Sequence, residues 1–223
     1  MKRLFLLVAV VFIIGCAQAK DFDYGLKQID SLNAKYNTTI ETYPKTIDKI
    51  NLMADNYKEL KGQVLENGQE PFSYVIDYRL LNLEAEKLFM QGQKYGNSGT
   101  TKHGFGCKQR PLVIESASFR NMSANKAFEA VGLLREFVAK YPQESGKAGL
   151  SNKNALFLNA TFYEIARNAR SDSNTINRFC PENATLELYR EDLRKHTNFT
   201  EEMISNISYG EAVPIWKLMK GIK

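Results

Sequence analysis

The sequence predicts an all-α protein, either a helical bundle or a helical-hairpin array, with about seven or eight helices. Two observations lead to this prediction. Large apolar residues recur at spacings of three and four along most of the chain, which is the pattern of an amphipathic helix. Prolines and glycines interrupt that pattern and mark helix ends, whereas the alternation typical of a strand is weak throughout.

Three helices are expected before residue 95. A short helix is predicted around residues 26–32, where three apolar side chains share one side. A long helix follows over Pro44–Val64, because proline favours the first helical turn, and Gly68 is expected to stop the chain there. Pro71 opens the next helix, which is apolar on more than one side and is therefore expected to be central to the bundle.

The stretch Tyr95–Arg110 is different in composition. It contains four glycines, two adjacent threonines and three basic residues, so no regular element is expected there. Backbone freedom and positive charge would suit an anion-binding loop. The phosphate-binding glycine patterns are absent, which favours a plain surface loop fixed by Cys107.

Five further helices are expected after this loop, with boundaries set by prolines and by apolar spacing. They cover residues 111–141, residues 154–170, the stretch from Pro181, residues 199–207 and the stretch from Pro214. Pro142 is expected to end the first of them, and a loop with Gly146 and Gly149 leads to the second.

The N-terminus has the three parts of a secretory signal. A basic start precedes the apolar run Leu4–Ile14, and small residues follow it. The run of 11 residues is shorter than the roughly 20 that a membrane-spanning helix needs. Ile13-Ile14-Gly15-Cys16 resembles the lipobox of prokaryotic lipoproteins, and this resemblance implies that Cys16 becomes the lipid-modified first residue of the mature protein. Ala17-Gln18-Ala19 offers the alternative of ordinary cleavage before Lys20.

These readings divide the chain into three parts. Residues 1–15, or alternatively 1–19, form the signal peptide. Residues 16–36 form a flexible stem and a short helix, and residues 37–223 form a single helical domain. Loss of two basic signal residues lowers the formal net charge from +5 to +3, an excess too small to indicate nucleic-acid binding.

The cysteine count is even in either mature form, because Cys16 is lipid-modified or removed. Cys107 and Cys180 then remain in an oxidising compartment, where a disulfide is the simplest outcome. A zinc site formed by both cysteines with His103 and His196 is a more specific alternative, since two cysteines and two histidines can supply the four tetrahedral ligands of zinc. The spacing differs from that of compact zinc modules, and two unpaired thiols are the remaining possibility.

Six Asn-x-Ser/Thr triplets are candidate glycosylation sites, which make physical sense only on an exported surface. Simple richness in asparagine is the competing explanation. The triplets begin at Asn37, Asn121, Asn159, Asn183, Asn198 and Asn206.

No motif for nucleophilic or metal catalysis is present, so neither a cofactor nor a metal is expected. Carboxylates at Glu84, Glu86 and Glu164 could face a groove, although pairing on helix surfaces explains them equally well. His196 is expected to be solvated near the C-terminal end of a helix. The last helix carries Trp216 on an apolar side and either closes its own bundle or docks on a partner or membrane.

The sequence therefore favours an exported, lipid-anchored surface or envelope protein that binds a partner or scaffolds an assembly without catalysis. Its expected associations are the membrane, through an N-terminal lipid, and a protein partner. The alternative is an extracytoplasmic enzyme or small-ligand-binding protein that uses carboxylates in a helical groove.

Overall fold

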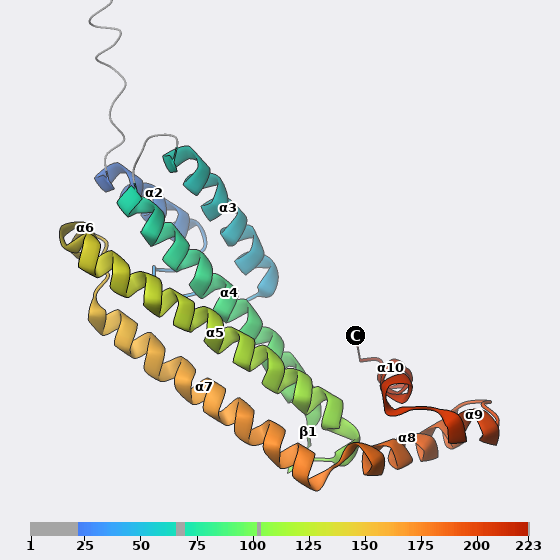
Figure 1. Ribbon diagram of the computed structural model, residues 1–223. Coiled ribbons are helices and arrows are strands. Elements are labelled where there is room, and N and C mark those ends of the chain that lie inside the picture. The colour runs from blue at the N-terminus through green and yellow to red at the C-terminus, as the bar shows by residue number, and fades with distance from the viewer. Residues whose placement is uncertain (1–21, 66–69, 102–103, 223) are drawn as a thin grey trace, which may run out of the picture. The chain divides into compact units, whose positions relative to one another are not determined.

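A computed structural model describes residues 22–65, 70–101 and 104–222 of the chain, and the signal peptide, Cys16 and His103 lie outside these ranges. The described part is all-α, which confirms the predicted fold class (Figure 1). Its α-helices are α2 (Phe22–Lys35), α3 (Ile47–Leu65), α4 (Glu70–Gly99), α5 (Arg110–Lys140), α6 (Pro142–Lys147), α7 (Asn152–Phe179), α8 (Glu182–His196), α9 (Glu201–Asn206) and α10 (Tyr209–Met219).

The segment Tyr95–Arg110 is more regular than its glycine content predicts. Helix α4 continues to Gly99, and a two-residue hairpin pairs β1 (Thr100–Thr101) with β2 (Gly104–Phe105) before the 3-10 helix η1 (Cys107–Gln109). Tertiary packing accounts for the longer helix. A Cβ atom on Gly92 would lie 2.9 Å from Cγ of Arg120, so glycine permits the close approach of α4 to α5. Ser116 Oγ fixes that contact by donating to the Gly92 carbonyl at 2.8 Å.

Two prolines were wrongly expected to open helices. Helix α3 begins at Ile47, three residues after Pro44. Helix α10 begins at Tyr209, so Pro214 lies inside it. A capping box starts α10 instead, because Ser208 accepts from the Glu211 backbone and the Glu211 side chain accepts from the Ser208 backbone.

A second difference concerns the stretch after α5, which was expected to be a loop. The six-residue helix α6 begins at Pro142, where proline occupies the first turn as its missing N–H allows. Gly149 follows with a positive φ of 68°, a conformation that glycine adopts without strain. The chain therefore makes one extra helical turn before α7.

The chain divides into two compact units. Unit 1 comprises the described residues up to Leu80 together with Gly132–Asn154, and unit 2 comprises Leu81–Val131 with the described residues from Ala155 onward. The core of unit 1 lies between α2, α3 and the first part of α4, and its fully buried residues include Ile50, Met53, Tyr57 and Phe72. None of the described helices is both long and apolar enough to cross a membrane.

In unit 2, α8 is the centre of the C-terminal helices. Helix α10 packs on α8, α9 contacts it, and η1 packs against it. An aromatic and apolar cluster of Leu112, Tyr189, Ala212 and Trp216 fills the space between α5, α8 and α10. The rings of Tyr189 and Trp216 stack with their centroids 5.2 Å apart. The apolar side of the last helix therefore closes its own unit.

Candidate functional site

Cys107 and Cys180 form a disulfide, as the cysteine count predicts. The bond joins η1 to the residue that follows α7, across 73 positions of sequence. Both sulfurs are used by this bond, which excludes the alternatives of a zinc site and of two free thiols. The described residues also contain no group of three or more histidines, cysteines or acids placed to hold a metal.

Polar contacts beside the disulfide fix α8 on η1 and on the start of α5. Lys108 Nζ lies 2.7 Å from Oδ1 of Asp192. The Tyr189 hydroxyl donates to the Lys108 carbonyl at 2.8 Å. Arg110 donates to the Tyr209 hydroxyl at 3.0 Å and to Asn177 Oδ1 at 2.7 Å. Helix α8 is therefore attached to η1 by the disulfide just before its first residue and by an ion pair and a hydrogen bond from its second half, while Arg110 links the start of α5 to α7 and α10.

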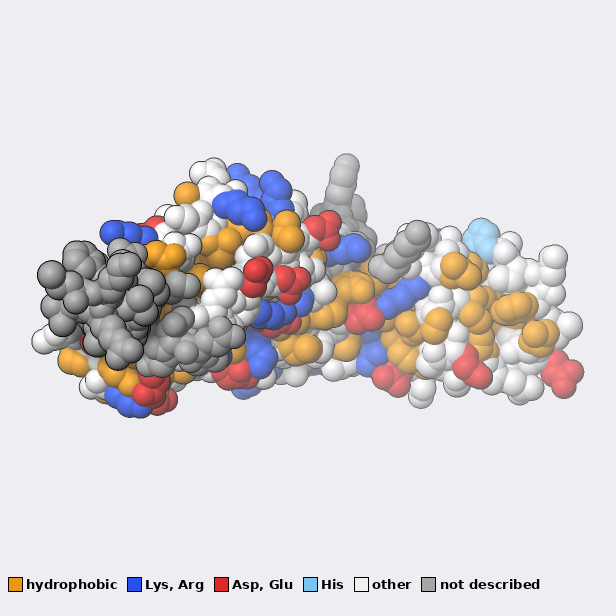
Figure 2. All heavy atoms as spheres, turned by 90° about the horizontal axis from the view of Figure 1, so that it is seen from above, with side chains coloured by type: hydrophobic (Ala, Val, Ile, Leu, Met, Phe, Trp, Pro, Cys, Tyr) orange, Lys and Arg blue, Asp and Glu red, His pale blue; other side chains and the backbone are white. Residues whose placement is uncertain are grey.

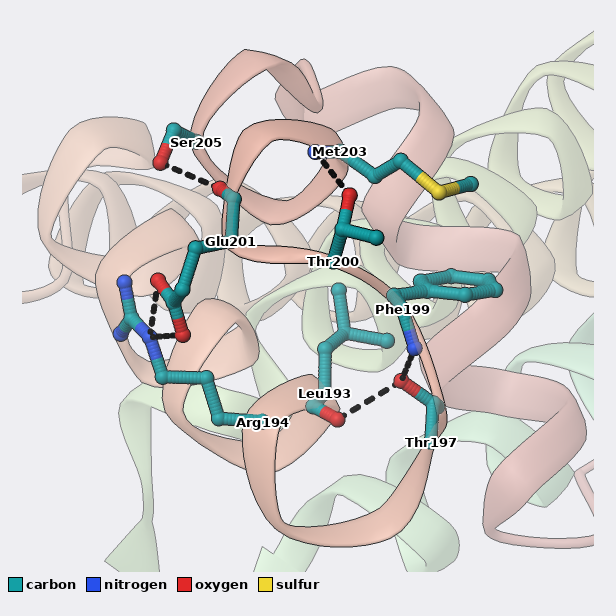
Figure 3. Close-up of polar contacts among 8 residues, drawn as sticks. All are labelled: Leu193, Arg194, Thr197, Phe199, Thr200, Glu201, Met203 and Ser205. Atoms are coloured by element: carbon teal, nitrogen blue, oxygen red, sulfur yellow. Dashed lines mark hydrogen bonds and ion pairs between the residues drawn. The ribbon is translucent and has the colours of Figure 1, made fainter.

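The C-terminal end of α8 leads into a short turn that is held by backbone capping (Figure 3). Thr197 Oγ1 donates to the Leu193 carbonyl at 2.7 Å and accepts from the Phe199 amide at 3.3 Å. Thr200 is the N-cap of α9, and its Oγ1 accepts from the Met203 amide at 3.2 Å. Two threonines thus supply acceptors for the Phe199 and Met203 amides at the helix ends, and the Leu193 carbonyl also accepts from the Thr197 amide at 3.0 Å.

Charged side chains brace the same turn from one side. Arg194 Nε donates to both carboxylate oxygens of Glu201 at 3.1 Å. Ser205 Oγ donates to the Glu201 carbonyl at 2.6 Å, and Arg190 donates to the Ser205 carbonyl at 2.7 Å and to the Ile207 carbonyl at 3.1 Å. These bonds connect α8 to both ends of α9, so the turn has a fixed backbone.

Two large apolar side chains project from this fixed turn. Phe199 is 37% exposed and Met203 is 55% exposed, whereas the neighbouring Leu193 and Ile204 are buried. Figure 3 shows that Phe199 and Met203 extend to the same side, away from the pair of Arg194 and Glu201. We call Phe199 and Met203 the α8–α9 tip.

Hydrophobic side chains are also grouped more widely over α8 to α10 on the face seen in Figure 2. Leu218 of α10 is 81% exposed. Leu156 and Phe157 of α7 are exposed as well. They adjoin residue 155, where the chain passes from unit 1 to unit 2, whereas the α8–α9 tip lies wholly within unit 2.

Two opposite charges lie close to the α8–α9 tip in the chain. Lys195 lies in the last turn of α8 and Glu202 lies in the first turn of α9, and both are exposed. Within the described ranges neither side chain forms an ion pair, whereas the adjacent Arg194 and Glu201 pair with each other. His196 is exposed beside Lys195, as its position at the end of a charged helix predicts.

The structure separates the six candidate glycosylation sites by exposure. Asn121 is only half-buried within the middle of α5, while the other five asparagines are exposed. Asn159 lies in the first third of α7 and Asn183 in the first turn of α8. Asn37, Asn198 and Asn206 lie between helices or at a helix end. Exposure is therefore compatible with a glycan at five of the six positions.

The hydroxyl residues of these triplets have structural contacts. Ser123 is buried and donates to the Ala85 carbonyl at 2.6 Å, and Thr185 is buried and donates to the Pro181 carbonyl at 3.1 Å. Thr200 and Ser208 cap α9 and α10 at the surface. Part of the abundance of triplets therefore reflects the use of serine and threonine in capping and packing.

The carboxylates singled out in the sequence do not meet in one groove. Glu84 pairs with Lys87 and Glu164 pairs with Arg167, each three residues further along the same helix. Burial raises the pKa of Glu86 above its ordinary value. None of the three lines the two pockets of about 280 and 310 Å³ found in units 2 and 1, and each of those pockets is lined by a single carboxylate.

The apolar spacing of Phe199, Met203 and Ile207 predicts a helix over residues 199–207, and the structure has the shorter helix α9 there. In the structure Ile204 takes the buried position, because Thr200 caps α9 and sets which residues of the short helix face α8. The sequence singles out Thr200 only as part of the Asn-Phe-Thr glycosylation triplet, and not as a helix cap. The capping role of the threonine is the feature that sequence reasoning missed.

No family model matches this chain, and neither a curated protein nor a solved structure matches it.

Proposed function

We propose that this chain is an exported, lipid-anchored surface or envelope protein that binds a protein partner or scaffolds an assembly through the α8–α9 tip. The observation that carries the proposal is the exposure of Phe199 and Met203 on a turn whose backbone is fixed by capping and ion pairing. The proposal is for binding, and it assigns no reaction to the site.

Preorganisation is the physical reason why such a turn suits binding. A flexible loop loses conformational entropy when it docks, whereas a braced turn has lost most of that entropy on folding. Aromatic side chains and methionine are enriched in the buried centres of protein interfaces. Two apolar side chains held on the same side of a fixed turn would supply such a centre.

Export and anchoring are supported by other features. The basic start, the apolar run and the small-residue end are those of a secretory signal. The resemblance of residues 13–16 to a lipobox supports an anchor on Cys16. The disulfide between Cys107 and Cys180 is stable in an oxidising compartment and would be reduced in an ordinary cytoplasm.

Intact-mass measurement and peptide mapping of the protein from its own host test export and anchoring. A diacylglyceryl group on an N-terminal Cys16 is the expected result. A mature chain beginning at Lys20 would overturn the anchor and leave export standing. A mature chain that still begins at Met1 would overturn both.

Site-specific photocrosslinking in cells of the host tests the binding role of the tip. A photoreactive phenylalanine at position 199 is expected to yield one discrete crosslinked product, and Met203→Asp is expected to abolish it. The same residue at Phe157, an exposed aromatic position of α7, is the matched control. Equal crosslinking at both positions, or none at position 199, would overturn the proposal.

A second candidate is the small-ligand-binding alternative, and one pocket favours it. The pocket of about 280 Å³ in unit 2 has Phe89 and Val113 among its lining residues and carries an ion pair between Arg120 and Asp172, with an N–O distance of 2.7 Å. Its size and mixed lining suit a small polar molecule. A metabolite screen by thermal shift tests this candidate, with Arg120→Met expected to abolish any stabilisation observed for the unmodified protein.

A further inference from the structure

We infer that the pocket of about 280 Å³ in unit 2 is a site for a single neutral sugar ring, which is either a free monosaccharide or the end of a glycan chain. This ligand class rests on the second candidate function proposed above and makes it specific. The charge of the lining, the hydrogen-bonding groups that it leaves unused and its apolar residues each favour such a ligand.

The lining of the pocket carries no net charge. Its charged residues are Arg120 of α5 and Asp172 of α7, which form an ion pair with an N–O distance of 2.7 Å. Their side chains are 17% and 32% exposed, so water screens the pair only in part. Asp172 would repel an anion in the pocket and Arg120 would repel a cation, whereas a neutral ligand meets neither cost. A zwitterion would have to separate the pair before its own charges were matched.

The same ion pair keeps hydrogen-bonding groups for a ligand. Arg120 uses Nη2 for Oδ2 of Asp172 at 2.7 Å and Nε for the Ser116 carbonyl at 3.4 Å. Among the described residues, no group bonds to Nη1 of Arg120 or to Oδ1 of Asp172, and both atoms remain accessible to solvent. A hydroxyl group can accept from the guanidinium and donate to the carboxylate at the same time. Unused donors and acceptors on adjacent side chains therefore suit a ligand that carries several hydroxyl groups.

Two carboxamides of α4 add further donors and acceptors to the lining. Gln93 and Asn97 are four residues apart, so they lie on the same side of the helix, and both line the pocket. Both are exposed, and neither side chain has a hydrogen-bond partner in the part of the chain that the structure describes. Each amide can both donate and accept, as each hydroxyl group of a sugar does.

Apolar residues complete the lining, and the volume limits the ligand to one ring. Phe89 lies four residues before Gln93 on the same side of α4 and lines the pocket together with Val113 of α5. The Phe89 ring offers a large apolar surface for the C–H groups of a pyranose. A volume of about 280 Å³ is close to the lower limit of ligand pockets, which is roughly 300 Å³, so the pocket suits one sugar ring and not an oligosaccharide held along its length.

Saturation-transfer difference NMR tests the inference on the mature chain, with Cys16→Ser to remove the lipid and the disulfide intact. The probes are D-glucose, D-galactose, D-mannose and N-acetyl-D-glucosamine at millimolar concentrations, and at least one of them is expected to bind. The uronic acid and the protonated amino sugar of the same configuration are each expected to bind at least about tenfold more weakly, because each brings a charge that the lining repels. Absence of binding by every neutral probe would overturn the inference, and so would a charged sugar that binds as well as the neutral one.

Substitutions on α4 show whether binding occurs in this pocket. Gln93→Leu and Asn97→Leu are each expected to raise the dissociation constant about fivefold, because each removes a neutral hydrogen bond to the ligand and breaks none within the described residues. Gln91→Leu removes the same kind of amide from a position of α4 that does not line the pocket, and it should leave the constant unchanged. Circular dichroism and thermal unfolding establish that each variant is folded. Equal constants for these variants would place the sugar elsewhere and contradict the inference.

Methyl glycosides of the best neutral probe distinguish the two sources of the sugar. Binding that survives the methyl group indicates the end of a glycan chain, whereas binding that requires the free anomeric hydroxyl indicates a monosaccharide. Either result supports a sugar site.

Failure of this ligand class and failure of the second candidate function give different results. If the metabolite screen finds a ligand that requires Arg120 while no sugar binds, the pocket is a binding site and only its ligand class is wrong. If neither sugars nor metabolites bind, both are wrong.

Discussion

Lys108 and Asp192 are 84 residues apart in sequence, and their side chains form an ion pair of 2.7 Å beside the disulfide. The two partners differ in environment. The Asp192 side chain is 8% exposed, whereas that of Lys108 is 34% exposed. Because α8 is attached to η1 through this pair and also carries the α8–α9 tip, the pair contributes to the position of the tip.

Removal of either partner is expected to have unequal effects on stability. Lys108→Met leaves the buried Asp192 carboxylate without its counter-ion and is expected to lower the free energy of unfolding by about 2 kcal/mol, below the range for fully buried pairs. Asp192→Asn leaves a lysine that can reach water and is expected to cost about 1 kcal/mol or less. Urea unfolding of both variants with the disulfide intact measures the difference.

The double variant completes a thermodynamic cycle for this pair. If the two side chains interact as described, the double variant costs less than the sum of the single ones. Lys126→Met, which removes an exposed pair with Glu129 on α5, is the matched control and is expected to change stability by less than about 0.5 kcal/mol. Equal losses for Lys108→Met and Asp192→Asn would contradict the assigned difference in burial.

The disulfide is expected to be a major contribution to stability. In the chain-entropy account, closing a loop of 73 residues destabilises the unfolded chain by about 4 kcal/mol. Replacing both Cys107 and Cys180 with serine should lower the free energy of unfolding by roughly that amount. Urea unfolding of a Cys16→Ser protein, with and without the two replacements, provides the comparison. Unchanged stability would show that the unfolded chain is compact enough to lose little entropy on closure.

Long periodic stretches are the part of the fold that could be predicted from sequence. The apolar spacing within residues 44–64 and 111–141 predicts α3 and α5, because in a helix of that length the spacing of buried residues repeats over several turns. The even number of cysteines in the mature chain predicts the disulfide between Cys107 and Cys180. This prediction does not depend on the fold, because two thiols that remain in an oxidising compartment pair with each other.

Features that depend on contacts between distant segments could not be predicted. The end of α4 at Gly99 depends on its packing against α5 through Gly92 and Ser116, which overrides the low helical preference of glycine. Helix α9 has only six residues, which is too short for its apolar spacing to identify the buried side. The exposure of Phe199 and Met203 therefore required the structure.

Arg79 is a buried cation that fixes the connection between α2 and α3. Its guanidinium donates to the Ile40 carbonyl at 3.0 Å and to the Thr42 carbonyl at 2.6 Å, and it lies over the Tyr43 ring. Arg79→Lys keeps the charge and loses the planar fork of donors, so one carbonyl is left without a partner. We expect a loss of about 2 kcal/mol in the free energy of unfolding.

Trypsin provides a local measure of the same change. Lys45 lies in the connection that Arg79 holds and is exposed. Cleavage after Lys45 should therefore be faster in Arg79→Lys than in the unmodified protein, while cleavage after Lys195 should not change. An unchanged rate after Lys45 would show that the connection is held by other contacts.

Alkaline pH is expected to destabilise unit 1 through Tyr57. Burial raises the pKa of this phenol from 10.0 to about 12, and its hydroxyl donates to Asn33 Oδ1 at 2.9 Å. Below pH 10.0 the phenol is protonated in both states and its contribution is fully present. Between pH 10.0 and about 12 the unfolded chain loses the proton first, so stability falls as the pH rises, by at most about 3 kcal/mol.

Tyr57→Phe isolates this contribution from other groups that titrate in the same range. The variant lacks the phenolic proton, so its free energy of unfolding should decrease less steeply above pH 10.0 than that of the unmodified protein. Urea unfolding at pH values below and within the window gives the two slopes. Parallel slopes would contradict the assigned burial of the hydroxyl.

Glycan occupancy is expected to follow the exposure of the folded triplets. In a host that attaches N-glycans to folded, exported protein, we expect modification at Asn198 and none at Asn121. Asn198 lies in an exposed turn, and the hydroxyl of its Thr200 is at the surface. Asn121 lies within α5, and Ser123 would have to leave its buried contact with Ala85 before the triplet could be reached.

Glycopeptide mapping measures the occupancy at each position. Ser123→Ala removes the Asn121 triplet and serves as a control that should not change the glycan mass, while Thr200→Val should remove the glycan at Asn198. Thr200→Val also removes the cap of α9, so Asn198→Gln distinguishes loss of the glycan from loss of the cap. A glycan found at Asn121 would show that attachment precedes the packing of α5 against α4, and that exposure in the folded chain does not select the sites.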